Sequence, residues 1–232
     1  KAIEQASPGA NGKKQVTIEV PKQANAQSYV VQLPTSNLQS NNNVEFVLKT
    51  DHAALQIPSN MLSNNTEQAD QVSIQISKVL ADRLNAEVRA KVGSRPVIDL
   101  SIKAGDRVLA WNNPAAPVTV SVPYTPAGQE LANAHQIVIL NIDSQGKAAV
   151  VPNGRFDAKS GSVVFKTAEF STYAVAYVTK SFADVQHVLW AKEAVEAMAA
   201  RDIIKGISDQ SFAPAASITR ADFITLLVRA LE

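Results

Sequence analysis

Short runs in which apolar and polar residues alternate recur from residue 16 to residue 178. Residues 16–20 and 118–122 alternate cleanly, and each run is followed by a proline, Pro21 or Pro123. Proline cannot donate to a strand ladder, so these prolines favour strands that end in turns. Similar runs lie at residues 31–33, 44–49, 55–57, 72–77, 97–102, 108–111, 137–142, 148–151, 162–167 and 172–178. Many short strands with few helices predict an antiparallel β-sandwich.

The composition of the chain changes at both ends of this region. Residues 1–15 are small and polar, which predicts a linker from something upstream. Residues 16–179 would form the sandwich, either as one unit or as two subdomains divided near residue 93. Within it, Leu80, Leu84 and Val88 are spaced four apart and predict one short helix in residues 79–91. Residues 180–232 would form a separate helical unit.

Two helical patterns occupy this last unit. The first places apolar residues on one stripe and leaves Lys192, Glu193, Glu196 and Arg201 on the wet face. The second follows Thr219, whose hydroxyl can cap the first turn of a helix, with Asp222 three residues later as a capping-box partner. The two expected stripes are Trp190, Ala191, Ala194, Val195, Met198 and Ala199, then Phe223, Leu226, Leu227, Ala230 and Leu231.

The segment between the two patterns predicts a defined loop. Gly206 is expected to end the first helical region, and Pro214 to fix the loop. The fold class predicted for the whole chain is therefore mainly β plus α, with an antiparallel β-sandwich followed by a small helix-loop-helix unit.

The order of unlike residues in residues 181–232 resembles an S-layer homology repeat. The residues that carry the resemblance are Phe182, Asp184, Val185, Trp190, Ala191, Gly206, Phe212, Pro214 and the run Ile218-Thr219-Arg220-Ala221-Asp222-Phe223.

The resemblance implies binding to a secondary cell wall polymer, a polysaccharide that often ends in a pyruvylated amino sugar. Carried onto this chain, the polymer-contacting residues would be Asp184, Trp190, Gly206 and Arg220. A guanidinium offers a planar fork for a pyruvate carboxylate, an aromatic face can lie against a sugar, and a glycine lets a sugar approach closely.

Each of these residues also has a structural interpretation. Trp190 could be a core residue, Asp184 a helix-start cap, and Arg220 a partner in a local ion pair. One position departs from the family pattern, because Gln210 stands where a glycine usually follows Asp209. If that position requires a positive φ, glutamine costs about 1 kcal/mol relative to glycine.

A single repeat cannot bury both faces of its two helices, and stacked repeats generally need about three units. We therefore expect this repeat to be the first of three in the same chain, or to pack on the sandwich or on repeats from other chains. The family forms a three-sided prism of three repeats.

Several classes of partner and chemistry are disfavoured by the sequence. The chain has 22 basic and 21 acidic residues without a basic stripe, so no nucleic-acid partner is expected. It has no cysteine and no apolar run of membrane-spanning length, and no signal peptide is visible at Lys1. His52, His135 and His187 are isolated from one another, so we predict no metal, no cofactor and no enzymatic activity.

The sandwich carries two further motifs. The end of the region resembles self-cleaving sandwiches that cut at His-Phe-Ser, but Glu169 replaces the activating histidine before Phe170 and Ser171, so we expect an intact chain. Trp111 and Tyr124 could form a sugar-stacking platform, although core packing is the favoured interpretation of Trp111.

Together these features predict a non-catalytic anchoring segment of an exported Gram-positive surface protein, secreted and held in the cell wall or S-layer. One alternative is the C-terminal part of a large secreted polysaccharide-degrading enzyme. Another is a carbohydrate-binding or adhesive sandwich.

Overall fold

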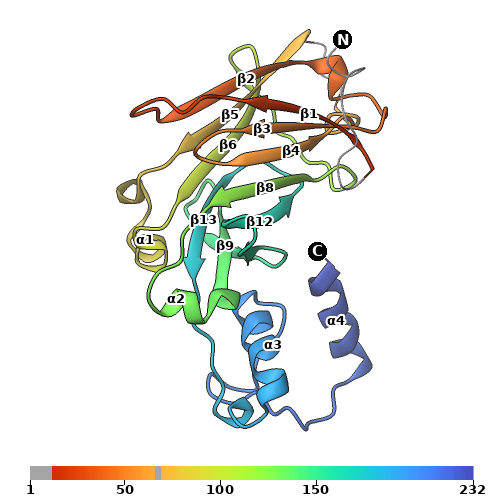
Figure 1. Ribbon diagram of the computed structural model, residues 1–232. Helices are drawn as coiled ribbons and strands as arrows, with labels where there is room; N and C mark the ends of the chain where they lie inside the picture. The colour runs from red at the N-terminus through yellow and green to blue at the C-terminus, as the bar shows by residue number, and fades with distance from the viewer. Residues whose placement is uncertain (1–11, 66–68, 232) are drawn as a thin grey trace.

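The alternating runs form two facing β-sheets in the computed structural model, with a helical unit at one end of them (Figure 1). The structure describes residues 12–65 and 69–231, and within these residues one sheet has six strands and the other seven. In spatial order the first contains β1 (Lys14–Glu19), β3 (Val44–Lys49), β4 (Ala54–Pro58), β8 (Val118–Pro123), β12 (Ser162–Thr167) and β11 (Arg155–Asp157). The second contains β10 (Ala148–Val151), β9 (Ile137–Ile142), β13 (Thr172–Tyr177), β6 (Val97–Ala104), β5 (Gln71–Lys78) and β2 (Ser28–Pro34), with β7 (Arg107–Val108) beside β6.

Strand pairing is antiparallel throughout the described sheets except between β1 and β3, which run parallel. In this pair Lys14 lies opposite Val44 and Glu19 opposite Lys49. Lys14 and Gln15, which the sequence assigns to the linker, therefore lie in β1, and the rest of that linker up to residue 11 lies outside the described residues. Both sheets combine strands from before and after residue 93.

The main core lies between the two sheets. Alternate residues of β5 and β8 point into it, as the period of a strand requires. Trp111 is buried there and its Nε1 donates a hydrogen bond to the Met61 carbonyl at 2.8 Å, so this tryptophan is a core residue rather than a sugar platform. Part of the outer face of the larger sheet is covered by α1 (Ala86–Val92), which packs Val88 and Val92 against Val138 and Leu140.

Two local differences from the sequence predictions have local causes. The helix expected within residues 79–91 starts only at Ala86, because the Asn85 side chain accepts the backbone N–H of Val88 at 2.9 Å and caps it there. A 3-10 turn, η2 (Ala81–Arg83), takes up the preceding residues. The strand expected at residues 108–111 ends at Val108, since the chain then turns to bury Leu109 and Trp111.

Short elements that the sequence did not predict connect the strands. They are η1 (Thr35–Asn37), α2 (Gln129–Ala132) and η3 (Ala134–Gln136), together with the three-residue strand β11.

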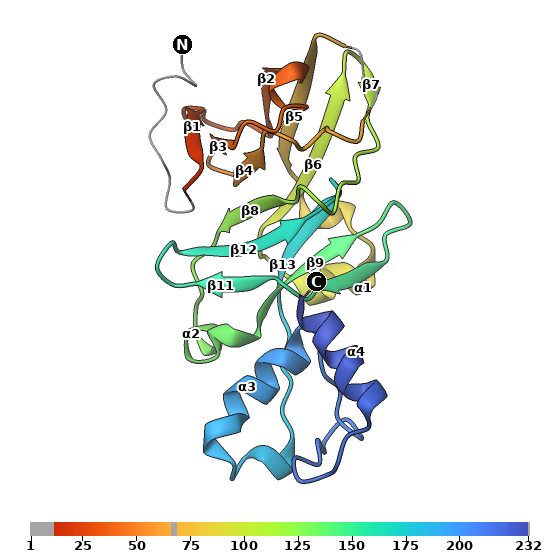
Figure 2. The same ribbon diagram turned by 90° about the vertical axis from the view of Figure 1, so that its right-hand side faces the viewer.

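The helical unit contains η4 (Ala183–Val185), α3 (Leu189–Ala200) and α4 (Arg220–Leu231). Figure 2 shows α3 and α4 below the sandwich, with the connecting loop at the far end. The small core of the helical unit contains Phe182, Val185, Val195, Ala199, Ile203 and Ile204. The helix-loop-helix prediction is thus confirmed, and α4 has its expected capping box: Asp222 N donates to the Thr219 hydroxyl at 3.1 Å, and Thr219 N donates to the Asp222 carboxylate at 3.1 Å.

Part of the α3 face that was predicted to be exposed to solvent packs on the sandwich, while Glu193 is exposed as predicted. Glu196 is only 4% exposed, because η3 lies against this helix. His135 of η3 is placed between Glu193, at 3.7 Å from Nδ1, and Glu196, at 3.8 Å from Nε2. Gln136 also donates a hydrogen bond to the Lys180 carbonyl at 3.0 Å. The wet-face prediction for Glu196 was therefore wrong, since it treated the helix without its neighbour.

Candidate polymer-binding site

Asp184 holds the loop of the helical unit in place. Its carboxylate accepts hydrogen bonds from the Ser211 hydroxyl at 2.7 Å, from Phe212 N at 2.9 Å and from Ala213 N at 2.7 Å. The backbone N–H groups of Phe212 and Ala213 and the Ser211 hydroxyl hold the pKa of the Asp184 carboxyl below its usual value. Its oxygens thus have partners within the chain, and its immediate role is to fix the path of residues 211–213.

Gly206 is required by close packing rather than by an unusual φ. A Cβ atom at this position would lie 2.5 Å from Phe182 Cε1, from the Ser208 carbonyl and from the Ser211 carbonyl. The prediction that Gly206 ends the first helical region was wrong. Helix α3 ends at Ala200, and Asp202 takes the left-handed conformation with a φ of 56°.

The concern about Gln210 is resolved by the same loop. Gln210 has no positive φ, and the left-handed residue of this segment is Ala213, with a φ of 60°. The condition under which glutamine would be strained is therefore not met. Gln210 instead accepts the backbone N–H of Ala183 at 2.9 Å through its carbonyl, which joins the loop to η4.

Trp190 points away from the core of the unit and is 88% exposed. It lies in the first turn of α3 and, with Ala194 four residues later, forms the outer edge of the apolar stripe. The buried part of the stripe starts one residue later, at Ala191, and continues through Val195 and Ala199. The core-packing interpretation of Trp190 is therefore wrong in this structure, and its indole face is available to a partner.

Arg220 is the first residue of α4 and is exposed. Within the described part of the chain, no carboxylate is paired with its guanidinium, so the local ion pair considered for it is absent. It lines a shallow apolar hollow of about 310 Å³ together with Ile218, Thr219, Phe223 and Ile224. A cation beside apolar side chains is suited to a ligand that has both an acid group and a methyl group.

The four predicted contact residues do not gather in one cavity. Gly206 lines a different, polar hollow of about 360 Å³ with Lys180, Asp202, Lys205 and Asp209, and this hollow shares no residue with the one at Arg220. The structure thus keeps the Gly206 side and the Arg220 side of the unit apart. Trp190 and Arg220 each present a group to solvent, whereas the Asp184 side chain is occupied by the loop.

An apolar face runs along α4 and is uncovered. None of the helix residues is buried, and only Leu226 contributes to the small core. The exposed apolar residues here are Ile218, Phe223, Ile224, Leu227, Val228 and Leu231. An uncovered face of this kind usually marks an interaction surface.

The candidate self-cleavage residues are engaged elsewhere. The Ser171 hydroxyl donates to the Ile142 carbonyl at 3.1 Å, and the Glu169 carboxylate accepts a hydrogen bond from the Asn141 amide at 2.8 Å. Phe170 packs edge-on against Trp111, with the ring centroids 4.9 Å apart.

Among the described residues, no set of three or more histidine and acidic side chains is arranged to hold a metal ion, and no helix has the length and apolar character needed to cross a membrane.

Comparison with known proteins identifies the helical unit. The family model of the S-layer homology domain matches residues 181–224. An amylopullulanase of Thermoanaerobacterium thermosulfurigenes is 26% identical over 223 residues, which are 94% of this chain and 11% of that protein. A surface layer protein of Brevibacillus choshinensis is 27% identical over 127 residues, 50% of this chain and 11% of its own length. An endo-1,4-beta-xylanase A of Thermoanaerobacterium saccharolyticum is 37% identical over 52 residues, 22% of this chain and 4% of the xylanase.

This chain therefore spans about a tenth or less of the length of these relatives. S-layer homology domains anchor proteins at the cell surface, and one of the relatives is itself a surface layer protein. Residues 181–224 are an S-layer homology domain, carried behind a β-sandwich as a cell-surface anchoring module.

Proposed function

We propose that this chain is a non-catalytic anchoring segment of a secreted Gram-positive protein, held in the cell wall or S-layer by a secondary cell wall polymer. The ligand would be the pyruvylated amino sugar of that polysaccharide. Of the four candidate contacts, Arg220 and Trp190 would touch the polymer directly. Asp184 and Gly206 would shape the loop beside it.

The observation that carries this proposal is the surroundings of Arg220. Its guanidinium is exposed at the start of α4 and is not paired with a carboxylate in the described chain, and Ile218, Phe223 and Ile224 form the apolar hollow next to it. A ketal-linked pyruvate presents one carboxylate and one methyl group. The arginine fork suits the carboxylate, and the hollow suits the methyl group.

We propose the division of the chain that the sequence suggests, with its first boundary moved to the start of β1: a linker that ends before Lys14, a sandwich spacer from Lys14 to residue 179, and a repeat over 180–232 that is the first of three. The uncovered apolar face of α4 supports further repeats, because such a repeat would bury this face. These repeats would belong to the same protein or to neighbouring copies.

A second candidate places this segment at the non-catalytic end of a large polysaccharide-degrading enzyme. The similarity to the amylopullulanase, which extends over 94% of this chain, favours that origin. Both proposals give this segment the same anchoring role. They differ in what the rest of the protein does, and the complete gene would separate them.

The test measures binding to purified cell walls by the chain joined to two further S-layer homology domains. We expect Arg220→Ala to weaken binding by about 1.5–3 kcal/mol, the scale of a hydrogen bond to a charged group. Arg89→Ala, at an exposed arginine on α1, is the matched control and should bind like the parent protein. Removal of the ketal pyruvate from the walls should abolish the difference between the two variants. Equal binding by Arg220→Ala and the parent protein would assign Arg220 to structure instead.

A further inference from the structure

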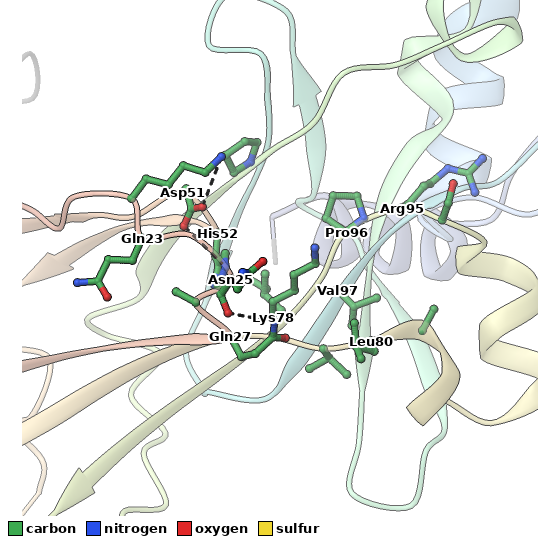
Figure 3. Close-up of a pocket in the computed structure, with 17 residues that line it drawn as sticks. Gln23, Asn25, Gln27, Asp51, His52, Lys78, Leu80, Arg95, Pro96 and Val97 are labelled. Carbon is green, nitrogen blue, oxygen red and sulfur yellow. Dashed lines mark hydrogen bonds and ion pairs between the residues drawn. The ribbon is translucent and has the colours of Figure 1, made fainter.

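The sandwich carries a hollow of its own at the ends of its strands. It has a volume of about 680 Å³ (Figure 3). Five segments form it: the loop between β1 and β2, the β3–β4 turn, the end of β5, the start of β6 with the residues before it, and Pro123 at the end of β8. None of the residues that line it belongs to the helical repeat. Loops held at the end of a rigid sandwich are a frequent place for binding sites.

Hydrogen bonds within these segments hold the walls in position. Thr50 Oγ1 accepts the backbone N–H groups of His52 at 3.2 Å and Ala53 at 3.1 Å, which fixes the β3–β4 turn. The Tyr29 ring meets the His52 ring edge-on, with the centroids 5.0 Å apart. On the opposite side, Val79 N donates to the Val97 carbonyl at 2.9 Å. A hollow that is already formed loses little conformational entropy when a ligand enters.

Figure 3 shows two chemically different sides of this hollow. Gln23, Asn25 and Asp51 lie on one side and offer hydrogen-bond donors and acceptors, and the aliphatic surfaces of Pro96 and Val97 lie on the other. Side-chain amides and carboxylates suit hydroxyl groups, and aliphatic surfaces suit the C–H faces of a sugar ring.

The basic residues of the hollow differ in whether their charge is compensated. Lys22 Nζ lies 4.0 Å from the Asp51 carboxylate, and Arg95 donates to Glu130 from Nε at 2.9 Å. In the described chain no carboxylate is paired with Lys78, whose side chain lies between the two sides of the hollow in Figure 3. One uncompensated cation among hydroxyl-binding groups favours a ligand that carries isolated carboxylates, whereas a phosphate-rich ligand would require several.

We propose that this hollow binds an acidic oligosaccharide, with Lys78 contacting a carboxylate and the amide side chains contacting hydroxyl groups. The inference goes beyond anchoring by the repeat, because its residues are separate from Arg220 and its hollow. A weak second contact with a wall glycan would gain from the tether, since an anchored sandwich meets the glycan at a high effective concentration.

The test uses the whole chain and two six-unit probes of opposite character, hexagalacturonate and maltohexaose. Binding is measured by calorimetry and by amide chemical shifts. We expect hexagalacturonate to bind more tightly and to shift amides in residues 22–27, 51–52, 78–81 and 94–98. Lys78→Gln should weaken this binding about tenfold, the loss expected for one charge-assisted contact. Lys159→Gln, at an exposed turn, should not change it.

Several results would overturn the proposal. These are the absence of binding by hexagalacturonate, equal binding of maltohexaose, shifts confined to residues 180–231, or an equal loss in Lys78→Gln and Lys159→Gln. Because Lys78 is exposed and its side chain makes no ion pair in the described structure, its variant should keep the melting temperature of the parent. Wall binding through Arg220 is measured separately, so failure of one proposal leaves the other standing.

Discussion

Replacement of Phe182 by alanine tests what holds the S-layer homology domain together. The Phe182 side chain is 3% exposed and packs against Phe212, with the ring centroids 5.6 Å apart. Its ring also approaches the backbone at Gly206 so closely that a methyl group there would clash. Phe182 is thus the largest side chain of a core that has few other members.

The size of the effect follows from the burial. A buried phenylalanine removes about 150–250 Å² from water, and truncation of such a residue to alanine typically costs 3–5 kcal/mol. A unit of about 50 residues that follows the usual 0.05–0.15 kcal/mol per residue has roughly 2.5–7.5 kcal/mol in total. The loss is therefore comparable with the whole stability of the repeat. We expect Phe182→Ala to unfold the loop and α4 in much of the population, while the sandwich keeps its structure.

Hydrogen exchange of the whole chain measures this directly. In Phe182→Ala the amides of Phe212 and Ala213, which donate to Asp184, should lose protection, and amides of β9 should keep it. The matched control is Phe223→Ala, because Phe223 is 57% exposed and its loss should cost less than about 1 kcal/mol. Equal protection of the loop in both variants would show that the small core is not what stabilises this unit.

Three further predictions concern the pH response, association and self-cleavage. The folded-state pKa of Asp184 is held low, so its contribution to stability is present above the unfolded pKa of about 3.9 and is lost as the pH falls through the folded value. Thermal unfolding measured at decreasing pH should therefore show that the repeat loses stability below about pH 4. The Asp184→Asn variant should show a smaller change of stability with pH. Sedimentation should show concentration-dependent association that disappears in Phe223→Asp or Leu227→Asp, and a strictly monomeric parent chain would contradict the interaction role of α4. Mass spectrometry after ageing at neutral pH should show an intact chain, and fragments that disappear in Ser171→Ala would refute this.

The strands could be predicted from the sequence because their signals are local. Alternation fixes which residues face the core, and the prolines after β1 and in β8 mark strand ends. The capping box could be predicted for the same reason, since Thr219 and Asp222 lie within one turn of helix. Strand β11 was missed because three residues carry too little pattern to detect.

The other errors have a tertiary cause. The spacing of Trp190 places it at the edge of a helical stripe, and only the neighbouring elements decide whether that edge is covered. Glu196 is buried by η3, which is distant in the sequence. The hollow beside Lys78 is built by five separate segments, so no local pattern points to it. The family pattern singled out Asp184 as a polymer contact, and its hydrogen bonds to Ser211, Phe212 and Ala213 could only be seen in the structure.

The two sides of the repeat differ, because one packs on the sandwich and the other is exposed. Stacked repeats need a cap on each outer face, because an end repeat otherwise leaves an apolar side uncovered. Here the sandwich covers one side: η3 packs on α3, Gln136 holds the Lys180 carbonyl, and Ala200 joins the apolar cluster of β9 and α1. The opposite side is α4, which is held by little more than Leu226 and a 3.5 Å hydrogen bond from Arg229 to the Ile203 carbonyl. Since one side is already capped, we expect a further repeat that packs on this one to use the uncovered face of α4, next to Arg220.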